Sequence, residues 1–160
     1  MAEAKTNAQR IVEKANIPIK TYTYDADSFS DGVTVAEKIG KDPLEVFKTI
    51  VTKGSKGGYF VFVVPSPSTI DFKRAAKSVG EKNVELVKLD DLLKLTGYIR
   101  GGCSPVGMKK LFPTVIDESA LLYDTITCSA GRRGLQMELD PNALADLIGA
   151  TFADIAVLEE

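Results

Sequence analysis

The sequence predicts an α+β protein in which peripheral helices surround a mixed, curled β-sheet. Strongly β-prone runs are joined by glycine-rich turns that are typical of hairpins. Helical segments are interspersed among these runs, but without the strict βαβ rhythm of a parallel sheet. No repeat or low-complexity linker divides the 160 residues, so we expect a single domain over 1–160, structured from about residue 5 to about residue 157.

The N-terminal part contains three helix-start signals and one strand. Thr6 is the predicted N-cap of a helix over 6–16, whose apolar residues recur at helical spacing. The segment over 19–24 is rich in Thr and Tyr and is the first predicted strand. Capping-box patterns at 34–37 (Thr before Glu) and 42–45 (Asp before Glu) predict two short helices, the second with proline at its first position.

The middle of the chain contains the strongest strand signals. The runs 47–52 and 59–64 are separated by a GSKGG turn, which predicts a hairpin. Because the second run is apolar, we expect a central strand that is covered on both faces. A PSPST loop over 65–69 follows, and Asp71 is the predicted N-cap of a helix that ends at Gly80.

The second half of the chain has shorter elements around one long loop. The segment GYIRGGCSPVG over 97–107 is too rich in glycine and proline for a regular element, so we expect a loop with another role. The other predicted elements are a strand over 84–87, a helix over 90–95, strands over 114–116, 125–130 and 135–139 with a GRRG hairpin turn between the last two, and a helix from Pro141 to Gly149 capped by Asp140.

The composition narrows the possible chemistry. The chain has no histidine, which excludes Ser-His-Asp and Cys-His catalysis and most zinc sites, and we expect neither a metal nor a cofactor. The formal net charge of −2 lacks the basic excess of an autonomous nucleic-acid binder, so RNA must be contacted through a local patch or a partner. A charged N-terminus, the lack of a long apolar run and only two cysteines predict a cytoplasmic protein without membrane association.

Lys48 lies at the start of the predicted strand over 47–52, next to an apolar run. Such a lysine is either a solvated charge at a strand end or a fixed cation that faces a cleft. In the second case, its partly desolvated ammonium group is suited to stabilise charge on a carbonyl or phosphate oxygen.

The GGCSP segment offers a second candidate site. Gly101 and Gly102 lack side chains, so their N–H groups can approach an ester closely and form an oxyanion hole; a tight structural loop is the alternative. Cys103 is a poor candidate nucleophile because no histidine is present to activate its thiol. Ser129 precedes a glycine-rich turn that either borders the same cleft or is a plain hairpin turn.

Several short motifs occur in a fixed order along nearly the whole chain. They are Tyr24-Asp25, Phe47-Lys48-Thr49, Ala75-Ala76-Lys77-Ser78, Thr96-Gly97-Tyr98 with Gly101-Gly102-Cys103-Ser104-Pro105, and Gly131-Arg132-Arg133-Gly134-Leu135. In this order and spacing they resemble the YbaK family of Cys-tRNA(Pro) deacylases. That family is related to the editing insertion domain of bacterial prolyl-tRNA synthetase.

The resemblance implies a mixed-sheet fold with a central groove that holds the 3′ end of an aminoacylated tRNA. It implies an essential Lys48, and we expect the amides of Gly101 and Gly102 to hold the developing charge. The implied substrate-binding residues are Tyr24, Asp25, Ser104, Pro105, Ser129, Gly131 and Arg133.

The chemistry implied by the resemblance fits a chain without histidine. The thiol of a mischarged cysteine attacks its own ester and leaves as a thiolactone, so the protein orients the substrate and stabilises an oxyanion. The expected activity is removal of cysteine from Cys-tRNA(Pro), and also from Cys-tRNA(Cys), with prolyl-tRNA synthetase as a partner in trans. For the RNA contact, we favour Lys73, Arg74 and Lys77 together with Arg133.

Three alternatives remain open from the sequence. A protein of the same fold would remove alanine or another small amino acid by a water-dependent route. A protein of this fold without catalysis would hold tRNA or a synthetase. A thiol-redox enzyme would use Cys103, which requires a thiol of low pKa.

Overall fold

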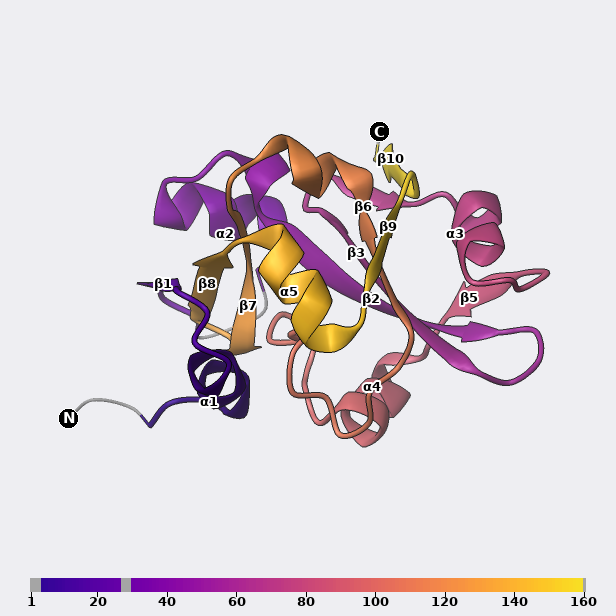
Figure 1. The fold of residues 1–160 in the computed structure, drawn as a ribbon, viewed down its shortest axis with the longest axis horizontal. Coiled ribbons are helices and arrows are strands. Elements are labelled where there is room, and N and C mark those ends of the chain that lie inside the picture. The colour runs from indigo at the N-terminus through magenta and orange to yellow at the C-terminus, as the bar shows by residue number, and fades with distance from the viewer. Residues whose placement is uncertain (1–3, 27–29, 160) are drawn as a thin grey trace.

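A computed structural model describes residues 4–26 and 30–159 of the chain and is shown in Figure 1. The α-helices are α1 (Asn7–Lys14), α2 (Gly32–Ile39), α3 (Phe72–Ser78), α4 (Leu89–Thr96) and α5 (Pro141–Ile148), and the short 3-10 helices are η1 (Pro43–Glu45) and η2 (Glu118–Leu122). The strands are β1 (Lys20–Thr23), β2 (Phe47–Gly54), β3 (Tyr59–Pro65), β4 (Ser68–Ile70), β5 (Val84–Leu86), β6 (Thr114–Asp117), β7 (Ile126–Arg132), β8 (Leu135–Leu139), β9 (Thr151–Ala153) and β10 (Ala156–Leu158).

Within the described residues, the strands form one mixed sheet and two smaller antiparallel sheets. The mixed sheet has the order β5-β2-β3-β6-β9, in which β2 is antiparallel to both neighbours and β6 is parallel to both neighbours. The second sheet has the order β1-β8-β7, and β4 pairs with β10 in the third. The helices lie around these sheets (Figure 1), which confirms the predicted α+β class with a mixed sheet.

Strand β3 is the central strand that the apolar run over 59–64 predicts. Val61 and Val63 belong to the larger apolar core, which also contains residues of α1, α5, β7 and β8. Phe62 and Val64 belong to a smaller core that includes the buried alanines of α3. Because successive side chains of a strand point to opposite faces, one apolar run contributes to both cores.

Three of the predicted helix caps are confirmed. Thr6 caps α1 in a capping box with Gln9, Asp71 accepts a hydrogen bond from the amide of Arg74 at the start of α3, and Asp140 caps α5. These caps are local interactions between residues close in sequence, so the sequence pattern is sufficient to locate them.

Of the two predicted capping boxes, the cap at Thr34 is wrong, whereas Asp42 is confirmed as an N-cap followed by Pro43. Asp31 accepts a hydrogen bond from the amide of Thr34 at 2.8 Å, so Thr34 lies inside α2 and is not its N-cap. Asp42 accepts a hydrogen bond from the amide of Leu44 at 2.9 Å, but only the 3-10 helix η1 follows. There is no room for a longer helix, because β2 begins at Phe47.

The predicted PSPST loop is partly wrong. Its last two residues belong to β4, which pairs with β10 near the end of the chain, with Thr69 opposite Val157. Strands β9 and β10 are not predicted either. Each is short and acquires its partner through a contact distant in sequence, which a local pattern of residues does not reveal.

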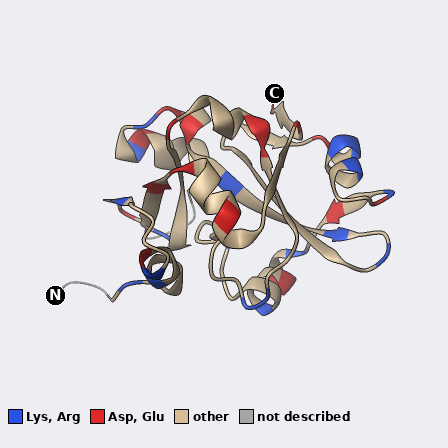
Figure 2. Cartoon of the chain, in the orientation of Figure 1, with Lys and Arg blue, Asp and Glu red and all other residues tan. Residues whose placement is uncertain are grey.

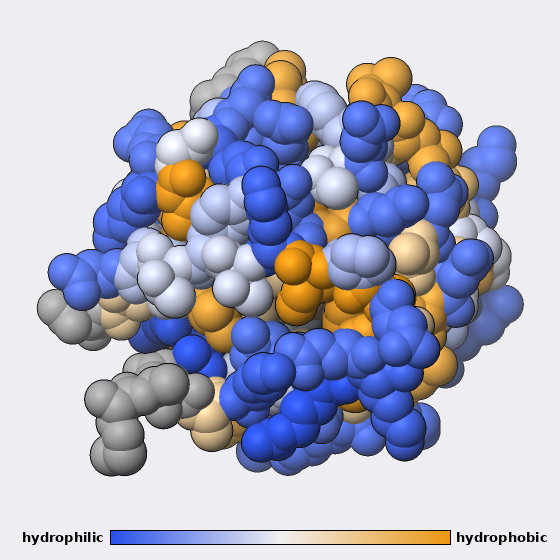
Figure 3. Space-filling view, turned by 60° about the vertical axis from the view of Figure 1, so that its left-hand side comes forward, coloured by the Kyte–Doolittle hydropathy of each residue, from blue (hydrophilic) through white to orange (hydrophobic). Residues whose placement is uncertain are grey.

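Most of the surface on the face shown in Figure 3 is hydrophilic, with small apolar patches between the polar side chains. None of the helices in the described part of the chain has the length and apolar character needed to span a bilayer.

Candidate active site

A cleft of about 690 Å³ borders the first half of β2. Along one edge, β2 pairs with β3 over 47–53. Along its other edge, β5 pairs only over 52–54, and Val46, just before β2, forms an isolated bridge with Thr127. The cleft borders the part of this second edge that lies between these two contacts. Its walls come from the start of α2, the turn before β4, the β5–α4 connection, the 97–107 loop and sheet β1-β8-β7.

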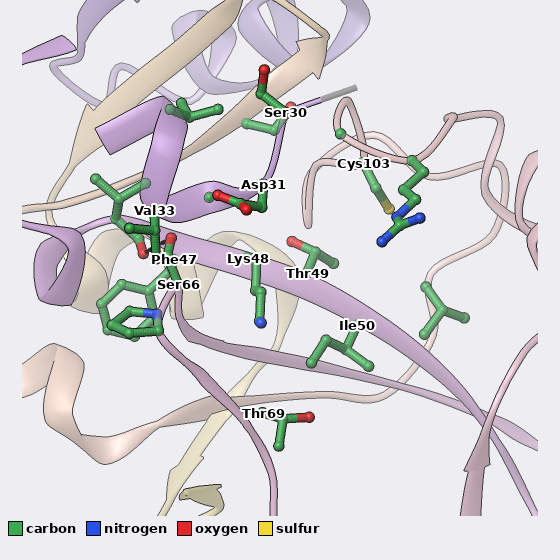
Figure 4. Close-up of a pocket in the computed structure, with 18 of the residues that line it drawn as sticks. Ser30, Asp31, Val33, Phe47, Lys48, Thr49, Ile50, Ser66, Thr69 and Cys103 are labelled. Carbon is green, nitrogen blue, oxygen red and sulfur yellow. Dashed lines mark hydrogen bonds between the residues drawn. The ribbon is translucent and has the colours of Figure 1, made fainter. Parts of the chain in front are cut away.

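The alternation of β2 gives the cleft two chemically different sides. Lys48 and Thr49 both line it, and Figure 4 shows their side chains on opposite sides of the strand. Ile50 extends to the same side as Lys48. Adjacent strand residues point to opposite faces, so this division follows directly from the Lys-Thr sequence.

The Lys48 side of the cleft is charged. The Nζ atom of Lys48 lies 3.6 Å from Oε1 of Glu159, which follows β10. Asp31, the N-cap of α2, also lines the cleft. The hydrogen bond from the Thr34 amide lowers the pKa of Asp31, and attraction to Lys48 contributes to the same shift, so this carboxylate is ionised at neutral pH.

Apart from Arg100, which also lines the cleft, the side chains on the Thr49 side are uncharged and largely buried. Gln136 is only 5% exposed and lies opposite Ser129 in the β7–β8 pair. Among the described residues, the side-chain oxygens of Thr49 and Gln136 are buried and have no hydrogen-bond partner. A buried polar atom without a partner is costly, so these two oxygens are available to a ligand that brings donors.

The 97–107 loop is held firmly at the edge of the cleft. Tyr98 donates its hydroxyl hydrogen bond to the Val106 carbonyl, and the Val106 amide donates to Ser104 at 3.2 Å. Arg133 donates to the Arg100 carbonyl at 2.8 Å, which ties the loop to the β7–β8 turn. The loop is therefore an ordered wall of the cleft. Its glycine and proline content alone does not reveal this order.

Three of the predicted site residues meet in this cleft. Lys48, Gly101 and Ser129 all line it, although they come from β2, the long loop and β7. Gly101 has a positive φ of 87°, a conformation that glycine adopts without strain. Cys103 lines the same cleft.

The Gly102 amide is engaged within its own loop, and its expected oxyanion role stays a prediction. This amide donates a hydrogen bond to the Ile99 carbonyl at 2.9 Å, so it is already engaged within the loop. A Cβ atom at Gly102 would lie 3.0 Å from the Arg132 Cα and from the Arg133 nitrogen. Gly102 therefore packs against the β7–β8 turn, and its lack of a side chain permits that close approach.

The other predicted binding residues lie outside the lining of the cleft. Ser104 is fully buried and bonds within its own loop, and Pro105 borders a separate pocket of about 200 Å³. Gly131 packs against Thr6 and the ring of Tyr98.

Tyr24, Asp25 and Arg133 surround the cleft region without lining it. The ring of Tyr24 lies 5.9 Å from Nζ of Lys38, and the carbonyl of Asp25 accepts a hydrogen bond from the same ammonium group. Arg133 acts on the cleft through the Arg100 carbonyl that it holds. Direct substrate contacts by these three residues stay predictions.

Neither thiol of the protein has the properties of a nucleophile. Both Cys103 and Cys128 are buried and free, and burial raises the pKa of each thiol to about 12. A thiol with this pKa is protonated at neutral pH and reacts slowly. The thiol-redox alternative therefore has no support in the structure.

The favoured RNA cluster is split in space. Lys73, Arg74 and Lys77 lie on α3, where Figure 2 shows a concentration of positive charge, whereas Arg133 binds the 97–107 loop. The charge of Arg74 is compensated by Asp71 and Asp154, at 3.4 and 2.6 Å. A joint role for these four residues in RNA binding stays a prediction.

Comparison with known proteins identifies the fold. The model of the aminoacyl-tRNA editing domain matches residues 29–147, a range that includes Lys48, Gly101 and Ser129. The chain belongs to the aminoacyl-tRNA editing domain family. The predicted relationship to YbaK-type editing proteins is thus confirmed.

The relatives of this editing domain include freestanding proteins and a synthetase region. It is 46% identical over 158 residues to EbsC of Enterococcus faecalis, whose name proposes a Cys-tRNA(Pro)/Cys-tRNA(Cys) deacylase; 98% of this chain and 96% of that protein are covered. It is 29% identical to a proline–tRNA ligase of Nautilia profundicola, with 96% of this chain and 28% of the ligase covered.

Solved structures share the fold of the editing domain. The hypothetical protein APE2540 matches with a TM-score of 0.86 at 21% identity, over 95% of this chain and 100% of that one. A structure described as a trans-editing enzyme for prolyl tRNA synthetase matches with a TM-score of 0.81 at 24% identity, over 98% and 100%.

Several residues that line the cleft of the editing domain are not among those predicted from the sequence. Strand alternation after Lys48 would have located Thr49 on the other side of β2, and the register of the GRRG hairpin would have placed Gln136 opposite Ser129. For Glu159 no local signal exists, because the β4–β10 pairing alone brings it to the cleft.

Proposed function

We propose that this protein is an aminoacyl-tRNA deacylase that removes cysteine from Cys-tRNA(Pro) and, by the same reaction, from Cys-tRNA(Cys). The observation that carries the proposal is a cleft with a fixed ammonium group, Lys48, on one side of β2 and neutral, buried polar groups on the other. The chain supplies no histidine and no reactive thiol of its own. The name of the 46% identical relative supports the choice of substrate.

In the proposed reaction the substrate provides the nucleophile. The cysteinyl sulfur attacks the ester carbonyl carbon, a C–S bond forms, and the C–O bond to the terminal ribose breaks. The thiol proton ends on the ribose oxygen, and a cyclic thiolactone leaves, which water then hydrolyses. Intramolecular reactions of favourable geometry reach effective molarities of about 10⁵ M or more, so the protein needs only to orient the reacting groups.

Lys48 is the proposed catalytic residue. Negative charge develops on the ester oxygen during the attack, and a partly desolvated ammonium group, with 32% of its side chain exposed, stabilises such charge better than bulk water does. Gly101 borders the same cleft and stays a proposed second contact to this oxygen.

The Thr49 side of the cleft is the proposed compartment for the substrate's side chain. Ser129 and Cys103 are each 7% exposed, so a thiol-bearing side chain is shielded from water there. Selection for cysteine would rest on the thiol's chemistry, because one methylene in a pocket discriminates only about 10- to 200-fold.

We further propose that the protein acts in trans with prolyl-tRNA synthetase, in the cytoplasm where charged tRNA is used. The match to one region of a proline–tRNA ligase supports this pairing, since that enzyme carries a region of similar sequence within its own chain. A net charge of −2 favours weak binding to tRNA alone, so a partner would supply tRNA selectivity. The proposal also treats the chain as one functional domain.

Single-turnover deacylation of Cys-tRNA(Pro), Cys-tRNA(Cys) and Ala-tRNA(Pro) tests the function. We expect both cysteinyl esters to be cleaved, with little cleavage of the alanyl ester, which lacks a thiol. Trapping of the released amino acid as its thiolactone would report the route directly.

Two outcomes would change the proposal. Equal cleavage of the alanyl ester would replace self-cyclisation by attack of water. Cleavage of none of the three esters would favour a binding protein of the same fold. Adding prolyl-tRNA synthetase tests the partnership, because we expect it to raise the preference for Cys-tRNA(Pro) over Cys-tRNA(Cys).

A further inference from the structure

The last described residue of the chain, Glu159, is fixed at the mouth of the cleft. Strand β10 pairs with β4, with Leu158 opposite Ser68, and the Glu159 amide donates to the Pro67 carbonyl at 3.0 Å. The backbone is thus anchored along β4 and at the residue before it, while 55% of the Glu159 side chain stays exposed. The carboxylate is held near the cleft and is open to a ligand.

The contact between Glu159 and Lys48 is loose. Their charged atoms are 3.6 Å apart, longer than the roughly 2.7–2.9 Å of a charge-assisted hydrogen bond. Asp31 supplies a second carboxylate to the lining of the cleft, and its Oδ1 atom is taken by the Thr34 amide. The exposed carboxylate of Glu159 beside Lys48 is therefore the group of the cleft best suited to bind a cationic ligand group.

The Thr49 side of the cleft is unsuited to a cation, and Arg100 adds a positive charge to the cleft lining. Gln136, Ser129 and Cys103 are 5–7% exposed and uncharged, and burial keeps the Cys103 thiol protonated. A buried cation without a counter-charge is strongly disfavoured. An aminoacyl ester carries its ammonium group next to its carbonyl, so the two groups can be recognised side by side on the charged side.

We infer that Glu159 binds the α-ammonium group of the aminoacyl ester while Lys48 contacts the neighbouring carbonyl oxygen. The assignment rests on the proposed deacylase function. It makes a free amino group a determinant of specificity, and it gives the C-terminal strand a role in substrate recognition.

The test compares two esters on the same tRNA. One carries cysteine and the other carries 2-hydroxy-3-mercaptopropionate, in which a hydroxyl replaces the ammonium group and the thiol is kept. Each single-turnover rate is measured below saturation and divided by the uncatalysed rate of the same ester. We expect the wild type to favour the cysteinyl ester about fivefold, the upper range for a solvent-exposed ion pair, and to lose part of this preference at high salt.

The decisive variant is Glu159→Gln, which should cleave the two esters with equal normalised rates. Glu13→Gln is the matched control, because Glu13 forms an exposed pair with Lys5 at 2.7 Å on a different part of the molecule. The control should keep the wild-type preference.

A Glu159→Gln variant that keeps the full preference for the cysteinyl ester would overturn this assignment alone. A wild-type protein that cleaves neither ester would overturn the deacylase function and the assignment with it.

Discussion

Two lysine–glutamate ion pairs of this molecule differ in how completely the protein satisfies their hydrogen-bonding capacity. Lys41 and Glu138 are 2.6 Å apart, and Glu138 also accepts hydrogen bonds from Tyr22 and Thr125 at 2.6 and 2.7 Å. Lys48 and Glu159 are 3.6 Å apart at the open cleft. The first pair has its hydrogen-bonding capacity filled by the protein, whereas the second leaves room for a ligand.

The electrostatics of the first pair follow from this closed network. Burial raises the pKa of Glu138, but the hydrogen bonds from Lys41, Thr125 and Tyr22 outweigh it and lower that pKa to about 2. The same hydrogen bond to Glu138 raises the pKa of Lys41. The network joins β1, β8 and the segments before η1 and β7, so we expect it to stabilise the fold and not to take part in the reaction.

The largest expected effect is a loss of activity that distinguishes Lys48 from Lys41. Lys48→Ala should slow single-turnover deacylation of Cys-tRNA(Pro) by about 100-fold or more, because it removes the charge that stabilises the oxyanion. Lys41→Ala should leave the rate within a few-fold of the wild type while lowering the midpoint of urea unfolding. Equal loss of activity in both variants, with both folded, would remove the distinction between the pairs. Lys53→Ala, also on β2 but exposed, controls for the loss of a positive charge.

The second prediction concerns acid stability. The folded-state pKa of Glu138 is about 2 and lies below its ordinary value of 4.5, so the stabilisation is present above pH 4.5 and is lost as the pH falls toward 2. We expect Glu138→Gln to lower the free energy of unfolding at pH 7 by roughly 2 kcal/mol and to flatten its decline at acid pH. Urea unfolding from pH 7 to pH 3 measures this. The idea fails if the free energy of unfolding of Glu138→Gln declines with falling pH as steeply as that of the wild type.

A third prediction uses two threonines of β2. The Thr49 hydroxyl is buried without a partner, whereas the Thr52 hydroxyl donates to the Phe60 carbonyl at 2.9 Å. Thr49→Val should raise the free energy of unfolding by about 1 kcal/mol and slow deacylation, and Thr52→Val should lower the free energy of unfolding by about 1 kcal/mol. Denaturant titration of both variants checks the signs. Destabilisation of the same size in both would show that Thr49 is an ordinary core residue.

The smallest expected effect is a lack of thiol reactivity. Because burial raises the pKa of Cys103 and Cys128 to about 12, iodoacetamide at pH 8 should modify neither thiol in the folded protein. Mass spectrometry before and after unfolding in urea measures the modification. Rapid alkylation of Cys103 in the native protein would return the thiol-redox alternative to consideration.

The sequence was most informative where the controlling interactions are local. The caps at Thr6, Asp71 and Asp140 and the hairpin of β2 with β3 depend on residues close in the chain, and they were predicted correctly. The helix predicted to begin at Thr34 begins earlier because Asp31 is also a good N-cap residue and accepts a hydrogen bond from the Thr34 amide, a choice between two caps that the sequence leaves open.

The candidate site likewise contains residues that the sequence predicts and features that depend on the folded loop. Lys48, Gly101 and Ser129 were selected for their residue type and position, and they do line one cleft. Nothing in the sequence shows that the amide of Gly102 is engaged. In the folded loop it donates a hydrogen bond to the Ile99 carbonyl. Whether a backbone group is free depends on the conformation of its neighbours, which glycine content leaves undetermined.

The sequence by itself determined the α+β class, the central apolar strand, the family and the absence of histidine chemistry, because these depend on composition, periodicity and short motifs. Only the tertiary structure decided which groups share the cleft. The bare stretch of β2 between β5 and Val46 opens it, and the pairing of β10 with β4 brings Glu159 to Lys48. Both depend on contacts between residues distant in the chain, whose partners are selected by the packing of the whole core.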